Sequence, residues 1–226
     1  MRHDGSSARR PILALAAAVP VVYAGLVRPR MLTWGATPEE IAATYPGDEL
    51  VPDAEGSSTM ATTLPAPPEV VWPWLVQMGT DRAGWYSWDR LDHGGRPSAD
   101  RIVPEWQGIE EGSRLIQAPD GSSWFTVAVL EPSQALVLVA NYELPTARSF
   151  DASSGPMPQA YMEGSWGFHL RPTADGGTRV VVRTRGKVRP RWLRRPFDVF
   201  GEPAHFIMQT RQFHNLHDRV SRPPVC

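Results

Sequence analysis

The sequence predicts an α+β fold: a curved antiparallel β-sheet wrapped around a long C-terminal helix, with two short helices after the first strand. Apolar residues recur at three-to-four spacing over 68–79, and polar and apolar residues alternate through much of 113–187. Residues 203–220 contain no Gly and no Pro after Pro203. The three-to-four spacing and the uninterrupted stretch 203–220 are typical of helices, and the alternation is typical of half-buried strands. One helix crossing a strongly curved sheet leaves a space between them.

Composition narrows the class of protein. The chain has 226 residues, a net charge of −1, 42% hydrophobic residues and 21% charged residues. This balance excludes a generally basic nucleic-acid binder, and the apolar content excludes wholesale disorder. The single cysteine, Cys226, cannot form an internal disulfide, and it excludes zinc sites built on several cysteines.

The N-terminal region contains an uncharged stretch. After a tail of residues 1–10, residues 11–27 carry no charge and are flanked by arginines. As a helix this stretch spans about 26 Å, slightly less than a bilayer core of ~30 Å. We interpret it as a single-pass transmembrane anchor in the cell membrane. A cleaved signal peptide, which would make the protein an exported one, and a buried apolar helix are the alternatives.

A linker is expected between this stretch and the main domain. Residues 28–57 are rich in Pro, Gly and acids, and contain a helix start in which Thr37 is the cap and Pro38 the first residue. We therefore expect a short helix over 38–44. The main domain is expected over 58–222.

The domain begins with a strand, 58–64, and a helix, 68–79, that buries Val71, Trp74 and Leu75. A second short helix is expected over 84–93. The remaining strands are expected at 113–118, 123–130, 135–141, 161–171 and 178–187.

The last of these strands and the final helix have distinctive patterns. Val180, Val182 and Thr184 alternate with arginines, which indicates a sheet with one dry and one wet face. The sequence Gly201-Glu202-Pro203 predicts the start of the final helix.

Six stretches of the sequence carry a resemblance to known proteins: Trp34–Thr37, Pro46–Leu50, Pro68–Gly79, Arg82–Asp89, Pro97–Ile102 and Glu202–Phe206. They resemble the START-related superfamily, also called SRPBCC, in the subgroup that carries an N-terminal apolar segment. The superfamily shares the helix-grip fold and includes polyketide cyclase/dehydrase-like and lipid-binding proteins.

The resemblance implies a membrane-anchored domain that binds a hydrophobic small molecule or lipid between the sheet and the final helix. A cyclase/dehydratase- or hydrolase-like enzyme acting in the same cavity is an alternative, and a non-catalytic structural or signalling domain is another. No dinucleotide or phosphate-binding glycine motif is present, so no cofactor is expected. No metal site is expected either, because His214 and His217 have no carboxylate to complete a ligand set.

Aromatic and aliphatic side chains on the inward faces of these elements are the expected ligand contacts, because aromatics offer large apolar area with a polar tip. They are Trp85, Tyr86, Trp88, Phe125, Val127, Trp166, Phe168, Val182, Ile207 and Met208.

Three residues are candidates for acid–base chemistry. Asp89 lies three residues from Asp92, so the two carboxylates would share a helical face. Glu202 and His205 are expected in the first turn of the final helix, where His205 could act as a general base. Burial, packing and surface ion pairs are the structural alternatives for all of them.

Residues 183–195 form a basic stretch. A solvated strand edge is one interpretation, because cations commonly protect exposed edges. Contact with an anionic membrane surface is another, and it would place the domain in the cytoplasm. Nucleic acid is not expected as a partner, because the rest of the domain is acidic. The cations are Arg183, Arg185, Lys187, Arg189, Arg191, Arg194 and Arg195.

Overall fold

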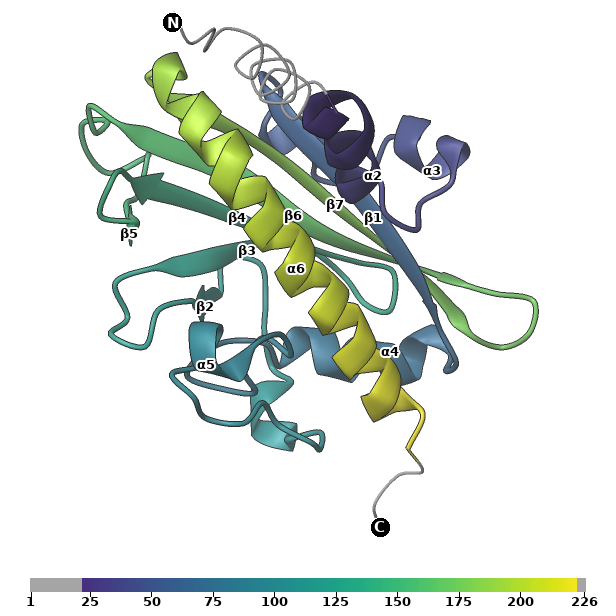
Figure 1. Cartoon of the computed structure of the whole chain (residues 1–226). Coiled ribbons are helices and arrows are strands. Elements are labelled where there is room, and N and C mark those ends of the chain that lie inside the picture. The colour runs from purple at the N-terminus through teal and green to yellow at the C-terminus, as the bar shows by residue number, and fades with distance from the viewer. Residues whose placement is uncertain (1–21, 223–226) are drawn as a thin grey trace, which may run out of the picture.

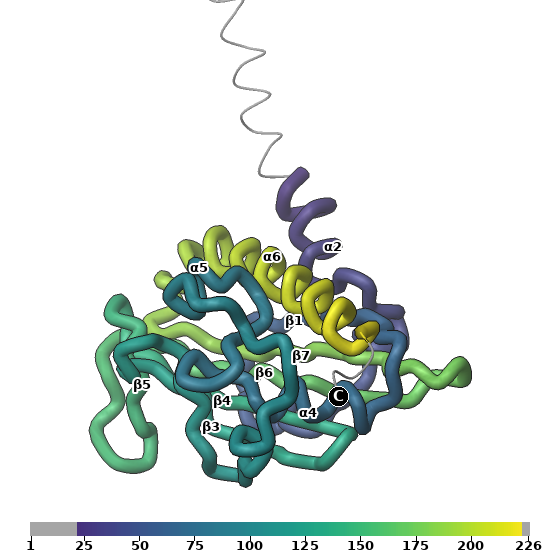
Figure 2. The backbone as a smooth tube through the Cα atoms, turned by 90° about the horizontal axis from the view of Figure 1, so that it is seen from below, coloured from purple at the N-terminus to yellow at the C-terminus, as the bar shows by residue number. Residues whose placement is uncertain are grey.

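The structure, a computed structural model, describes residues 22–222. A curved, open antiparallel sheet forms one layer, and a long C-terminal helix, α6, crosses its concave face (Figures 1 and 2). The strand order is β1-β7-β6-β4-β3-β2, with β5 paired to β4. This architecture confirms the predicted fold class. The strands are β1 Gly56–Leu64, β2 Arg114–Ile116, β3 Trp124–Glu131, β4 Ala135–Glu143, β5 Arg148–Ser149, β6 Tyr161–Pro172 and β7 Thr178–Arg189.

Short helices precede the sheet and connect its strands. A π-helical turn, Tyr23–Val27, continues into α2, and the 3-10 turns are Asp48–Leu50, Pro104–Trp106 and Arg191–Leu193. The α-helices are α2 Arg28–Leu32, α3 Pro38–Ala42, α4 Pro68–Val76, α5 Asp89–Asp92 and α6 Arg194–Val220.

The predicted start of the final helix is wrong. Helix α6 begins at Arg194, and Pro203 lies inside it. Proline removes one hydrogen bond from a helix interior. Here a tertiary contact holds the first turns in place, because Arg28 of α2 is paired with Glu202 and Asp198, and the i,i+4 pair Arg194–Asp198 adds support within the helix.

The predicted helix over 84–93 is shorter than expected. Only Asp89–Asp92 is helical. Gly84 and Tyr86 have positive φ values, +78° and +56°, which are incompatible with a right-handed helix. The Tyr86 ring is fully buried and its hydroxyl accepts a hydrogen bond from Gln77 Nε2 at 2.8 Å, so a core contact determines this backbone conformation.

One end of the concave face is filled by the core. Met60, Val182, Phe168 and Leu136 lie side by side in one cross-strand row of β1, β7, β6 and β4, and all four are fully buried. Helices α4 and α6 cover this row with residues such as Val71, Leu75, Phe213 and Leu216.

The convex face of the sheet is covered as well. Arg179 on β7 forms two hydrogen bonds of 2.7 Å with Glu40, and Arg183 donates to Asp48 at 3.1 Å. The Tyr45 ring lies 4.6 Å from the ring of His169 on β6. Residues 33–53, expected to be part of a linker, therefore pack against the sheet, and burial lowers the pKa of His169 to about 4.

The basic stretch 183–195 is largely neutralised within the domain. Strand β7 lies between β1 and β6, so the expected strand edge is an interior strand. Within residues 22–222, Arg195 is the one cation of the stretch without a carboxylate partner. The pairs are Arg183–Asp48, Arg185–Asp48, Lys187–Glu163, Arg189–Glu55, Arg191–Glu55 and Arg194–Asp198.

The covered convex face can be tested at Gly47. A methyl group at Gly47 would lie 2.6 Å from Val137 Cγ1, and the φ of Gly47 is +89°. Gly121 also has a positive φ, +73°, but faces open space. Gly121→Ala should cost about 1 kcal/mol from backbone strain. Gly47→Ala should cost roughly 1–3 kcal/mol more through overpacking. Urea unfolding measures both, and equal losses would contradict the packing of this segment on the sheet.

Candidate ligand cavity

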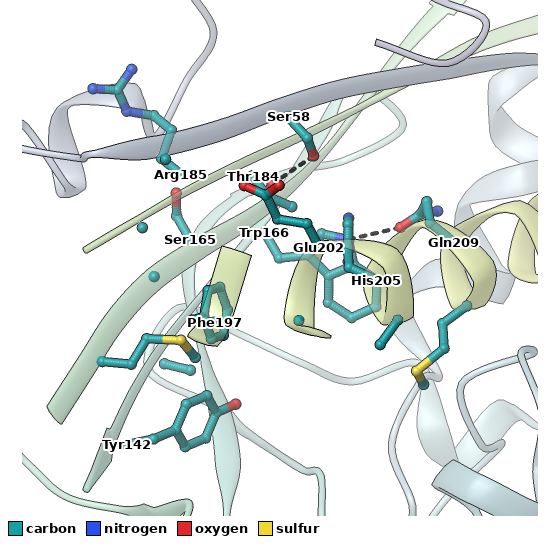
Figure 3. A pocket seen from close by; sticks show the side chains of 18 of the residues that line it. Ser58, Tyr142, Ser165, Trp166, Thr184, Arg185, Phe197, Glu202, His205 and Gln209 are labelled. Carbon is teal, nitrogen blue, oxygen red and sulfur yellow. Dashed lines mark hydrogen bonds between the residues drawn. The ribbon is translucent and has the colours of Figure 1, made fainter. Parts of the chain in front are cut away.

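A cavity of about 640 Å³ lies between the concave face of the sheet and α6. Its wall is mostly apolar, and its volume is typical of small-molecule sites, ~300–1,000 Å³. Figure 3 shows Trp166 of β6 beneath α6, together with His205 and Gln209 of that helix. Trp85, Phe125 and Met208 contribute further apolar wall.

The cavity exists because one cross-strand row of the sheet has almost no side chains. Gly56 of β1 pairs with Gly186 of β7, Gly186 pairs with Gly164 of β6, and Gly164 pairs with Ala140 of β4. All four lie on the same face as the core row and line the cavity. Four adjacent strands thus contribute at most one methyl group at this level, and the sheet surface is hollowed under α6.

The polar groups on the α6 side of the cavity are mostly satisfied. Trp166 Nε1 donates to Gln209 Oε1 at 3.1 Å, and Gln209 Nε2 donates to Gln212 Oε1 at 2.8 Å. Gln212 in turn donates to the carbonyl of Trp85 at 2.8 Å. This chain of hydrogen bonds fixes the Trp166 ring and connects α6 to the segment after α4.

Three titratable side chains in the wall have buried atoms without a hydrogen-bond partner in the described part of the chain; one of them, Glu55, is ion-paired with Arg189 and Arg191 through its other oxygen. His205 Nε2 has no hydrogen-bond partner among residues 22–222, and burial lowers the pKa of His205 to about 4. Both carboxylate oxygens of Asp92 also lack a partner there. Burial, with a smaller effect of Asp89, raises the pKa of Asp92 to about 6. The wall therefore offers a neutral imidazole and a carboxyl group that titrates near neutral pH.

The structure separates the three predicted acid–base candidates. His205 and Glu202 line the cavity, although neither lies in the first turn of α6. Both Glu202 oxygens accept hydrogen bonds from Arg28 at 2.6 Å, so this carboxylate already has a strong partner. Asp89 is not in the cavity wall and accepts a hydrogen bond from the Ser98 hydroxyl at 2.6 Å. Its neighbour Asp92 is the acid in the wall.

The expected ligand contacts divide into three groups. Trp85, Phe125, Trp166 and Met208 line the cavity. Trp88 and Ile207 are exposed on the surface, 45% and 51% respectively. The rest are buried in the core outside the wall: Tyr86, Val127, Phe168 and Val182.

Sequence reasoning did not single out some wall residues. Tyr142, whose hydroxyl donates to Gln117 Oε1 at 2.5 Å, is on the same face of β4 as the core residues Leu136 and Leu138, so alternation along that strand could have identified it. Gln209 lies one turn after His205 on α6 and could have been found from helical spacing. The row of small residues has no such local signal.

Comparisons with known proteins find only distant structural similarity. No protein-family model and no curated protein matches the chain. Protein NE0264 from Nitrosomonas europaea is similar over 73% of this chain and 94% of its own, at 15% identity and a TM-score of 0.45. Protein MLL2253 from Mesorhizobium loti is similar over 75% and 100%, at 18% identity and a TM-score of 0.43. DynU16, from the dynemicin biosynthetic locus, is similar over 71% of this chain and 46% of its own, at 16% identity and a TM-score of 0.41.

The class of fold is therefore defined by the chain's own architecture. An open curved sheet crossed by a C-terminal helix, with short helices near the start, is compatible with a helix-grip domain. Within residues 22–222, no helix has both the length and the apolar character needed to cross a bilayer. Most of the expected anchor, residues 11–21 of 11–27, lies outside the described residues.

The state of Asp92 gives a pH-dependent prediction. The pKa of Asp92 is raised in the folded protein, so its contribution favours the folded state at low pH and is lost as the pH rises through about 6. Asp92→Asn should therefore gain stability relative to the wild type between pH 4 and 7. The gain should be on the order of 1 kcal/mol, because the group is partly exposed. Urea unfolding at both pH values measures it. A carboxyl NMR titration of Asp92 with a midpoint near 4 would disprove the prediction.

Proposed function

We propose that this protein binds a hydrophobic small molecule or lipid in the cavity between the sheet and α6. The observation that carries this proposal is the row formed by Gly56, Gly186, Gly164 and Ala140, which leaves an apolar hollow, whereas the core row two levels further along the same face is fully packed. Well-packed protein interiors contain few voids larger than a water molecule. A hollow of about 640 Å³ is consistent with a bound molecule.

The polar atoms of the wall favour a particular ligand chemistry. Asp92 is mostly ionised above its pKa of about 6, so it accepts hydrogen bonds and disfavours a ligand carboxylate beside it. His205 is neutral, with one unpaired ring nitrogen. We therefore expect an apolar molecule that carries a hydroxyl or another neutral hydrogen-bond donor, because an unpaired buried polar group is costly until it has a partner.

Filling the hollow should weaken binding. Ala140 is 5% exposed and lines the cavity, so Ala140→Phe places a ring in it. Ala174, in the exposed turn between β6 and β7, allows the same substitution outside the cavity. With the neutral fluorescent probe N-phenyl-1-naphthylamine, Ala140→Phe should raise the Kd at least about tenfold. Ala174→Phe should leave it unchanged.

Two checks accompany this titration. Far-UV circular dichroism establishes that Ala140→Phe is folded, and Gly56→Leu fills the same row at a position where a methyl group would meet nothing within 4 Å. If both cavity variants are folded and bind the probe as the wild type does, the cavity is not the binding site. In a separate experiment, native mass spectrometry of the wild-type protein identifies the molecule retained from cells.

A second candidate function is acid–base catalysis in the same cavity. The observation that favours it is that Asp92 and His205, two groups able to exchange protons, both line the wall with unpaired atoms. A carboxyl group with a pKa near 6 is well suited to proton transfer at neutral pH. A dehydration or cyclisation of an apolar carbonyl compound would use such groups.

The mass of the retained molecule distinguishes a carrier from an enzyme. If the protein is a carrier, wild type, Asp92→Asn and His205→Gln should retain a molecule of one mass. If it is an enzyme, the variants should retain the substrate, which for a dehydration is heavier by one water than the product held by the wild type. Identical masses from all three proteins rule out the dehydration.

A further inference from the structure

Exposed apolar side chains gather around the first half of α6. Trp192 is 72% exposed and Phe200 75% exposed, and Leu91 in α5 is 76% exposed. Soluble surfaces rarely present large contiguous apolar areas without a partner. We call this surface the α6 patch; its residues are Trp88, Leu91, Trp192, Phe197, Val199, Phe200, Ala204 and Ile207.

The α6 patch belongs to one surface. Phe200, Ala204 and Ile207 follow each other at four- and three-residue spacing, so they form one stripe along the outer side of α6. The segment around α5 is attached to the same helix, since the Ser87 hydroxyl donates to the carbonyl of Met208 at 3.1 Å and the Arg211 guanidinium lies 5.0 Å from the Trp88 ring.

The cavity opens within this patch. Phe197, Ala204 and Leu91 are exposed and also line the cavity, which places them at its mouth. Asp92, next to Leu91, lies in the wall just inside. An apolar ligand entering the cavity therefore passes between α5 and the first half of α6.

The end of the apolar N-terminal stretch meets the domain on the same side of the sheet, on the flank of α6 opposite to α5 (Figures 1 and 2). Its last residues run into α2, and Arg28, the first residue of α2, is held by Glu202 of α6 through two hydrogen bonds of 2.6 Å. Leu26 and Val27 are exposed. Figure 2 shows α2 standing out from the side of the molecule that α6 covers, away from the sheet.

The charges around the patch favour an anionic surface. Arg90 and Arg195 are exposed, and Arg195 has no acidic partner within residues 22–222; Arg191 is exposed too but is paired with Glu55. The nearest acids of α6 are already paired, Asp198 with Arg194 and Glu202 with Arg28. Tryptophan together with arginine, beside exposed aliphatic and aromatic residues, is the composition found where proteins sit at a bilayer surface.

We propose that the α6 patch docks on a lipid bilayer and that the cavity mouth opens toward its apolar interior. The bilayer is favoured over a protein partner because the uncharged stretch 11–27 joins the domain beside the patch and the exposed charges are basic. Docking does not depend on the cavity having a ligand. The delivery of ligand from the bilayer rests on the proposed function.

The docking can be measured with one probe at a time on the full-length chain. In a Cys226→Ser background, Phe200→Cys and, separately, Val70→Cys carry a nitrobenzoxadiazole label. Val70 is also in a helix and is 46% exposed, but it lies on α4, near the other end of α6 (Figure 1). With vesicles of phosphatidylcholine and phosphatidylserine, the label at 200 should shift to the blue and be quenched by doxyl-labelled lipid. The label at 70 should do neither.

Any result other than a lipid response at position 200 alone contradicts the proposed docking. No lipid response at position 200, or equal responses at 200 and 70, means that the patch does not face the bilayer. A response at 200 that depends on protein concentration without lipid indicates that a second copy covers the patch. Trp192→Cys repeats the measurement if Phe200→Cys does not fold.

Delivery needs a separate measurement. Phe200→Asp should slow the uptake of N-phenyl-1-naphthylamine from preloaded vesicles about tenfold, since one buried phenyl is worth more than 1.4 kcal/mol. The affinity for probe added from solution should be unchanged. Equal uptake rates refute delivery through the patch. If the wild type binds no probe at all, the proposed function fails while the docking result stands.

Discussion

A register of four small residues across four strands is the constraint on which the rest of this structure depends. Gly56, Gly186, Gly164 and Ala140 come from distant parts of the chain and meet in one row because the strands pair in a single register. A slip of one residue in any strand would turn its small residue to the convex face and bring a larger side chain into the hollow, in β7 that of Arg185 or Lys187. The cavity is thus a property of the pairing as much as of the residues.

Charged pairs hold the elements around the sheet in place. On the convex face, Arg179 and Arg183 bind Glu40 and Asp48, and the segment that carries these acids covers the sheet. On the concave side, Arg28 binds Glu202 and positions α6 against α2. The side chains of these pairs are half-buried, and the carboxylates accept hydrogen bonds from the arginines. Ion pairs of this kind define geometry more reliably than pairs at a free surface.

The interior of the cavity combines an apolar wall with two unpaired polar groups. Neither His205 Nε2 nor the Asp92 carboxylate has a partner in the described chain, and such groups oppose folding unless something binds them. Asp92 adjoins Leu91 at the mouth, so one unpaired group lies where the α6 patch and the cavity meet. A ligand that enters tail-first from an apolar environment and leaves a hydroxyl near the mouth satisfies both features. Such a route of entry accounts for the cavity, the α6 patch and the position of α2 together.

The sequence by itself determined the elements that depend on local periodicity. Alternation identified the long strands and placed Phe125 and Trp166 in the wall, and helical spacing identified α4. Only the tertiary structure decided that α6 continues through Pro203, because its first turns are stabilised by contacts with α2. It also decided which inward residues form core and which form cavity. Residues at equivalent positions of a strand have the same local pattern, whereas the partner opposite each one is set by long-range pairing, which local sequence does not encode.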